Sequence, residues 1–152
     1  MPECNKECVK QVFDNLTEIL EIETFRTIFP IILTDNGSEF KGAEELENDK
    51  MTTPRTRVFY CDPLASWQKV KLEKNHEYIH KVIPKEVALI RQTQEDMTLL
   101  TNHINSTARA SLNDRTPYEL AQLLLSMRLF ESIKLGLIEA DKVTLKPSLL
   151  KH

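Results

Sequence analysis

PIILTDNGSEF, residues 30–40, joins a short apolar run to a turn sequence. Pro30 disfavours a helix in the residue ahead of it, and the β-branched residues that follow it suit a strand. Asn36 and Gly37 then end the strand, because Asn-Gly is a strong turn signal. We therefore predict a strand over residues 31–34 that presents Asp35 at its carboxyl end.

Asp35 has two interpretations on this motif alone. A carboxylate held beside the edge of a sheet suits a hard cation such as Mg²⁺, which takes oxygen ligands. Asp-Asn-Gly is also a common turn sequence, and it needs no metal to explain it. Both interpretations remain open until other segments are considered.

Helical periodicity surrounds this strand. Residues 7–20 place apolar side chains at helical spacing, so we expect a helix with one buried stripe. Thr93 with Asp96 resembles a capping box at the start of a later helix, and Thr116-Pro117 starts another helix because Pro is well placed in a first turn. Other expected elements are a short helix near 43–46, a strand at 57–61, a helix over about 66–82 and a tail from 141 that wraps over the surface or dangles. The apolar stripes expected are Val9, Val12, Phe13, Leu16, Ile19 and Leu20 in the first helix, and Leu120, Leu123, Leu124 and Met127 near the last.

The helix expected over residues 66–82 is the second segment whose residues could form a functional site. Glu73 lies in its first half, and His76 and Glu77 share its face because they are one turn away. Lysines flank Glu73 on both sides, which fits a metal ligand held near a phosphate backbone. A solvated helix with Glu–Lys pairs explains the same pattern. The lysines are Lys69, Lys71, Lys74, Lys81 and Lys85.

Length, composition and charge limit the class of protein and the partners to expect. The chain has 152 residues, 41% of them hydrophobic, and a net charge of −3, as expected of one helix-rich globular domain. Residues 52–91 hold 8 basic and 4 acidic side chains, whereas residues 1–51 hold 5 and 12. The middle segment is therefore a candidate phosphate-contacting surface.

With neither a secretory signal nor a membrane span in the sequence, we expect a cytoplasmic bacterial protein whose cysteines (Cys4, Cys8 and Cys61) are free thiols.

Taken together, the motifs resemble a known family. TDNGSEF, YCDP, SWQK, EKNHE and PK occur in that order over residues 34–85, followed by LTNHINSTARASLNDRTPYELA at 100–121. This order and spacing resemble the integrase catalytic core of bacterial insertion-sequence transposases, more closely the branch named after insertion sequence thirty. The resemblance covers nearly the whole chain and implies a ribonuclease-H-like fold.

The resemblance also implies residue roles. Asp35 and Glu73, with 37 residues between them, match the second and third acidic residues of an Asp-Asp-Glu triad. They would be the catalytic residues and the ligands of Mg²⁺ or Mn²⁺. The family uses two such ions to activate water or a DNA 3′ hydroxyl for attack on a phosphodiester. The residues that would contact DNA are Lys69, Lys71, Lys74, Asn75, His76, Lys81 and Lys85.

The first Asp of the triad and the strands that carry it have no counterpart in this sequence. We therefore expect an α/β, helix-rich, incomplete ribonuclease-H-like core over residues 1–110 and a C-terminal helical extension and tail over 111–152. As a fragment truncated at the N-terminus, it would be inactive alone and marginally stable or self-associating. DNA, both transposon ends and target, is the expected partner.

Two other functions remain open. A non-catalytic module would associate with itself or with a full-length transposase and inhibit it. A helical protein with no link to nucleic acid would show no salt-dependent DNA binding at all.

Overall fold

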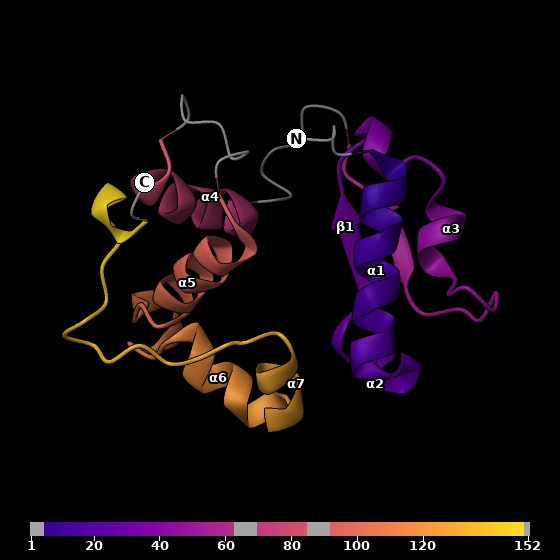
Figure 1. The fold of residues 1–152 in the computed structure, drawn as a ribbon. Helices are drawn as coiled ribbons and strands as arrows, with labels where there is room; N and C mark the ends of the chain where they lie inside the picture. Colours follow the sequence, from indigo (N-terminus) through magenta and orange to yellow (C-terminus); the bar gives the residue numbers. More distant parts are fainter. Residues whose placement is uncertain (1–4, 63–69, 85–91, 151–152) are drawn as a thin grey trace. The chain divides into compact units, whose positions relative to one another are not determined.

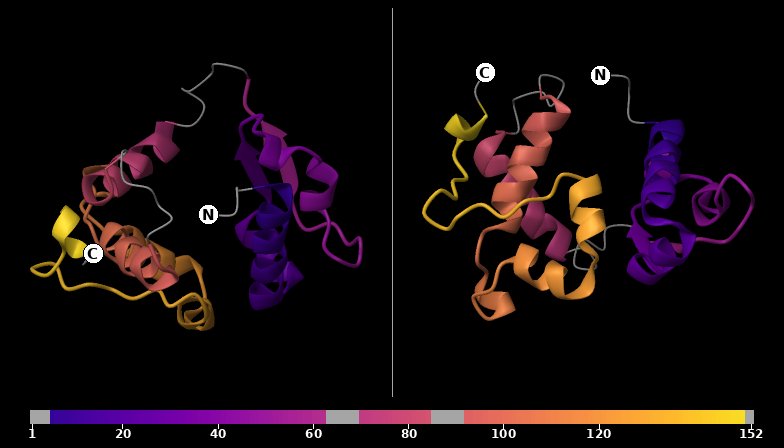
Figure 2. Two further views of the ribbon diagram at one scale, coloured as in Figure 1. Left: turned by 45° about the horizontal axis from the view of Figure 1, so that its top comes forward. Right: turned by 60° about the horizontal axis from the view of Figure 1, so that its bottom comes forward.

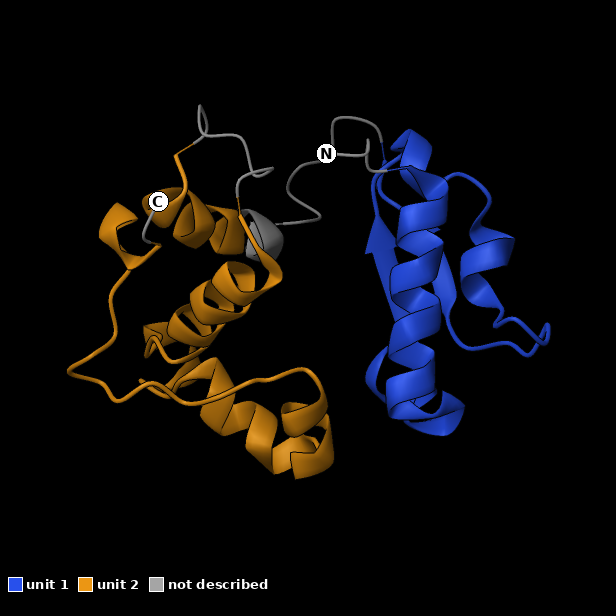
Figure 3. Cartoon of the chain, viewed as in Figure 1, with its two compact units in different colours: residues 1–69 blue, residues 70–152 orange. Residues whose placement is uncertain are grey.

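The computed structural model describes residues 5–62, 70–84 and 92–150, with the backbone alone at residues 70–73. The chain divides into unit 1, residues 1–69, and unit 2, residues 70–152 (Figure 3). The domain boundary expected at 110/111 falls within unit 2 and stays a prediction. The architecture is helix-rich α/β with one small parallel sheet, and in the part described no helix is long and apolar enough to cross a membrane.

Unit 1 wraps helices around a two-stranded sheet. Both strands expected from the sequence are present, and they pair in parallel with Thr34 opposite Tyr60. Figure 1 shows α1 in front of β1, with α3 to one side. The left-handed backbone at Gly42 (φ 87°) explains why glycine stands just before α3. The elements are α1 (Lys6–Leu20), α2 (Ile22–Ile28), β1 (Ile31–Thr34), the 3-10 turn η1 (Ser38–Phe40), α3 (Ala43–Glu47) and β2 (Arg57–Tyr60).

The two faces of the sheet differ in their exposure. Side chains alternate along each strand, so Thr34 and Val58 point to the buried face. On the other face Ile31, Leu33 and Phe59 are 61%, 47% and 50% exposed. We call these three residues the outer sheet face.

The buried stripe expected on α1 is wrong in part. Val12 and Ile19 are exposed, whereas Asp14 and Thr17 are buried beside Leu20. The helix is rotated because Asp14 and Thr17 both accept hydrogen bonds from Arg55 inside the unit. A polar contact with a residue far along the chain thus overrides the apolar pattern.

The regular elements of unit 2 are all helices in its described part, and a long segment without regular structure joins α7 to the last 3-10 turn. The capping box expected at α5 forms between Thr93 and Asp96, and the helix expected to start at Thr116-Pro117 begins with a second capping box, between Thr116 and Glu119. Each satisfies backbone N–H groups that a helix start otherwise leaves unpaired. The elements are α4 (Val70–Val82), α5 (Gln94–Asn105), the 3-10 turn η4 (Ala110–Leu112), α6 (Pro117–Leu124), α7 (Met127–Ser132) and the 3-10 turn η5 (Pro147–Leu149).

The tail of unit 2 packs against the helices and does not dangle. Figure 2 shows it passing along the helices of the unit. The Thr144 N–H donates to His103 Nδ1 at 3.2 Å, and the Ile138 N–H donates to Ser106 Oγ at 2.9 Å. Leu150 then enters the core of α4 and α5. That core consists of Val82, Ile83, Leu100, Ile104 and Leu150.

The apolar side chains expected to share one side of α6 are mostly exposed. Leu123 and Leu124 of α6 are exposed, and Leu120 is half-buried. Met127 is exposed at the start of α7. The buried contact comes from Tyr118, whose ring meets that of Phe130 edge-on with a centroid distance of 5.1 Å. An edge-to-face aromatic pair of this kind is favourable beyond the area it buries.

Candidate functional site

Asp35 lies where the sequence predicts it, exposed at the carboxyl end of β1. The Cys61 N–H donates to the Thr34 carbonyl at 2.7 Å, so the pairing of the two strands continues to the residue before Asp35. Asp62 comes two positions after the end of β2, following Cys61, and is also exposed. Because the strands are parallel and in register, both carboxylates occur at one edge of the sheet. Asp62 is not among the site residues expected from the sequence, although its place directly after a predicted strand was a usable signal.

The loop after Asp35 is held by short contacts. The Tyr60 hydroxyl donates to the Phe40 carbonyl at 2.6 Å and fixes the far end of η1. A Cβ at Gly37 would lie 2.6 Å from a Glu39 carboxylate oxygen. The Glu39 side chain therefore folds back over the backbone just beyond Asp35.

The described residues contain no group of three or more His, Cys, Asp or Glu side chains that could hold a metal ion. The Glu73 side chain is not among those described, so the expected pair of Asp35 and Glu73 stays a prediction. Carboxylate oxygens remain the right donors for Mg²⁺ or Mn²⁺. Cys8 and Cys61 are free thiols, as expected, and Cys4 lies outside the described residues.

Helix α4 carries the second part of the predicted site. The Lys74 ammonium donates to the Glu77 carboxylate at 2.6 Å on an exposed surface. This hydrogen bond lowers the pKa of Glu77 and raises that of Lys74. The plain interpretation, a helix with Glu–Lys pairs, is thus confirmed for this pair.

The other predicted residues of this helix are placed unevenly. His76 is exposed, and Asn75 is half-buried with its Oδ1 atom shielded and without a hydrogen-bond partner. Lys81 lies over the Tyr78 ring. Lys71 and Glu73 are described only as backbone of α4, and Lys69 and Lys85 lie outside the described residues. Asp35 belongs to unit 1 and the α4 residues to unit 2.

Comparison with known proteins finds transposases of bacterial insertion sequences. The chain is 30% identical over 66 residues to "Transposase InsI for insertion sequence element IS30A" of Escherichia coli, covering 43% of this chain and 17% of that protein. It is 30% identical over 91 residues to the transposase for insertion sequence element IS1086 of Cupriavidus metallidurans, covering 59% and 26%. The transposase for insertion sequence element IS4351 of Bacteroides fragilis is 27% identical over 94 residues, covering 62% and 28%.

The chain is homologous to insertion-sequence transposases. The matched segments span between about a sixth and somewhat more than a quarter of these relatives' own length. No family model matches the chain, and no solved structure matches it. The relationship therefore rests on sequence similarity to segments of transposases over about half of this chain.

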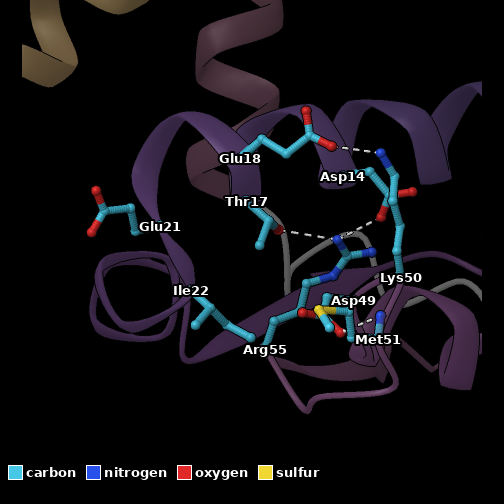
Figure 4. A pocket seen from close by; sticks show the side chains of 9 residues that line it. All are labelled: Asp14, Thr17, Glu18, Glu21, Ile22, Asp49, Lys50, Met51 and Arg55. Atoms are coloured by element: carbon cyan, nitrogen blue, oxygen red, sulfur yellow. Dashed lines mark hydrogen bonds and ion pairs between the residues drawn. The ribbon is translucent and has the colours of Figure 1, made fainter.

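In this transposase homologue, Arg55 has a structural role that the sequence pattern did not reveal. Arg55 is one of the basic residues of segment 52–91, yet its guanidinium is buried and pairs with Asp14 at 2.8 Å. Arg55 lines a cavity of about 330 Å³. Figure 4 shows Asp14 and Thr17 of α1 pointing toward its guanidinium. Arg55 is thus not available to a phosphate. Charge counting could not reveal this, because its partners lie about 40 positions earlier in the sequence.

Proposed function

We propose that this chain forms part of the catalytic core of a DDE-type transposase and acts in transposition. The observation that carries the proposal is its homology to insertion-sequence transposases. The fold we propose for the complete core is ribonuclease-H-like. Asp35 at the carboxyl end of a parallel strand supports that assignment, because the carboxyl ends of such strands are the usual place for functional residues in α/β sheets.

Asp35 and Glu73 are the two carboxylates to which we assign the divalent cation, Mg²⁺ or Mn²⁺. The cation would supply Lewis-acid activation of the attacking water or 3′ hydroxyl during DNA cleavage and strand transfer. Asp35 would be well placed because the strand pairing that precedes it fixes its backbone. Two carboxylates neutralise a pair of cations poorly, so we expect little strand transfer from this chain alone.

DNA is the partner we propose, and salt dependence is its signature. Contacts with phosphates release counterions, so affinity falls steeply as salt is raised. Lys81 and His76 are exposed on α4, whereas Lys74 is already paired with Glu77. We therefore expect weak, sequence-independent binding from this chain by itself.

The metal assignment is tested by Mn²⁺ binding, followed through paramagnetic broadening of backbone NMR signals. Asp35→Asn removes a charged ligand while it keeps the shape of the side chain. We expect Mn²⁺ binding to weaken by at least about tenfold, the loss typical even for partners outside the ligand shell. Asp141→Asn, the same change at an exposed residue of unit 2, is the control and should leave binding unchanged. Equal Mn²⁺ affinity in wild type and Asp35→Asn would refute the assignment.

A second candidate function has its own observation. The outer sheet face exposes three large apolar side chains, and contiguous exposed apolar surface marks interaction sites. A module that associates with itself or with a full-length transposase would use such a surface. Its self-association is the property to measure.

A further inference from the structure

Tyr78 on α4 is approached by two cations from different parts of unit 2. The Lys81 Nζ atom, one turn later on the same helix, lies 5.1 Å from the centre of the Tyr78 ring. The Arg109 Cζ atom lies 5.1 Å from the same centre. Since both distances end at one point, the two charged groups are separated by at most twice 5.1 Å, about 10 Å.

Neither cation forms a salt bridge within the described part of the chain, although the pKa of Glu77, lowered chiefly by its pairing with Lys74, is also lowered by the charge of Lys81. No hydrogen bond to a described residue leaves the side chain of Lys81 or Arg109. The Arg109 Nε atom is even shielded from solvent without an acceptor. A guanidinium has five N–H donors, and none of those of Arg109 donates to a described residue. Because Nε is shielded, the terminal N–H groups are the ones that can meet an external anion.

The backbone around Arg109 fixes the position of this guanidinium. The Arg109 N–H donates to the Arg115 carbonyl at 3.1 Å. In return the Arg109 carbonyl accepts from the N–H groups of Leu112 at 2.8 Å and Asp114 at 3.1 Å. The loop between α5 and α6 therefore presents Arg109 from a rigid base, and the Tyr78 ring packs on the core of the unit. A site whose groups are fixed before binding loses less entropy when the ligand arrives.

We propose that Lys81 and Arg109, both stacked on Tyr78, form a phosphate-binding clamp for a nucleic-acid backbone. One DNA strand carries a phosphate about every 3.4 Å along the helix axis, so two cations within about 10 Å of each other can contact the same or neighbouring phosphates. Arg binds phosphate through two parallel N–H bonds, and Lys adds a point charge. That the phosphate belongs to DNA rests on the proposed function, whereas the capacity to bind phosphate does not.

The first test measures the affinity of the 152-residue chain for a fluorescent DNA duplex of about 20 base pairs, between about 50 and 200 mM salt. Each phosphate contact contributes about −0.9 to the slope of log affinity against log salt. Arg109→Gln should make the slope shallower by about 0.9, and Lys81→Gln should do the same. Lys142→Gln removes the same charge from an exposed lysine of unit 2 and is the control. Arg109→Lys should restore the slope but not the full affinity, because the planar two-bond contact is lost.

The second test is independent of DNA. Inorganic pyrophosphate is titrated into ¹⁵N-labelled protein, and the Arg109 Nε–H signal is followed by NMR. A shift of this signal that Lys81→Gln weakens supports the clamp. If DNA does not bind and pyrophosphate still shifts the signal, the clamp stands and the proposed function fails.

The proposal is overturned in two ways. One is DNA binding with the wild-type salt slope in both Arg109→Gln and Lys81→Gln, which would leave the proposed function intact. The other is an Arg109 Nε–H signal that does not respond to either DNA or pyrophosphate. Should Arg109→Gln fail to fold, the exposed Lys81→Gln gives the same decision.

Discussion

At the scale of single residues, Arg55 is the largest fully buried side chain among the described residues. Its guanidinium donates to Asp14, Thr17 and the Leu46 carbonyl at 2.8, 3.0 and 2.9 Å. It also lies 5.5 Å from the centre of the Phe13 ring. Burial alone would raise the pKa of Asp14, but the hydrogen bonds from Lys10 and Arg55 lower it below its ordinary value.

Removing Arg55 should therefore destabilise the protein strongly. Arg55→Met leaves Asp14 buried with Lys10 as its remaining partner, and breaking a buried pair costs about 3–5 kcal/mol. We expect a loss near 3 kcal/mol, because Lys10 compensates in part, measured by urea unfolding. Arg57→Met, on the exposed part of β2, should cost less than about 0.5 kcal/mol. A loss below 1 kcal/mol for Arg55→Met would mean that the buried pair does not hold α1 in place.

At the scale of elements, the features that depend on adjacent residues were predicted correctly, whereas those that depend on long-range contacts were not. The strand before Asp35 and the helix starts at Thr93 and Thr116 depend on adjacent residues, so they could be predicted from the sequence. The buried side of α1 depends on Arg55, and no local pattern contains that information. The same holds for the candidate site. Asp35 was found from its turn, whereas the approach of Arg109 to Tyr78 arises only when two distant segments fold together.

The attachment of the tail to α5 should depend on pH through His103. Burial lowers the pKa of His103 below its ordinary value, and its neutral Nδ1 atom accepts the Thr144 N–H. The folded state then binds fewer protons than the unfolded state as pH falls through about 6.5. The contribution to stability is therefore complete above about pH 6.5 and is lost as the pH falls from there toward the folded-state pKa.

We expect the hydrogen-exchange protection of the Thr144 amide to fall between about pH 7.5 and 5.5, after correction for the intrinsic exchange rate. His103→Gln should remove this pH dependence. His76→Gln, at an exposed histidine, should keep it. Unchanged protection of Thr144 across this range in the wild type would show that protonation of His103 does not control the tail.

At the scale of the whole molecule, the distribution of exposed apolar surface predicts association. Among the described strands, β1 and β2 pair only with each other, so each has an edge without a described strand beside it. Open strand edges next to apolar side chains favour pairing with another chain. Leu33 lies opposite Phe59 at the centre of the outer sheet face. This surface is therefore where we expect copies of the chain to meet.

Leu33→Lys tests this expectation by placing a charge on the outer sheet face. Wild-type protein should sediment increasingly fast as its concentration rises between about 1 and 100 μM, a range in which exposed strand edges drive association. Leu33→Lys should sediment as a monomer throughout, because a lysine on an open strand opposes edge pairing. Met51→Lys makes a matched change at an exposed apolar residue outside the sheet, and it should still associate. A wild type that is monomeric at every concentration and melts in one sharp transition would show that the two-stranded sheet is stable without a partner. In that case, the interaction-module alternative would lose its only structural support.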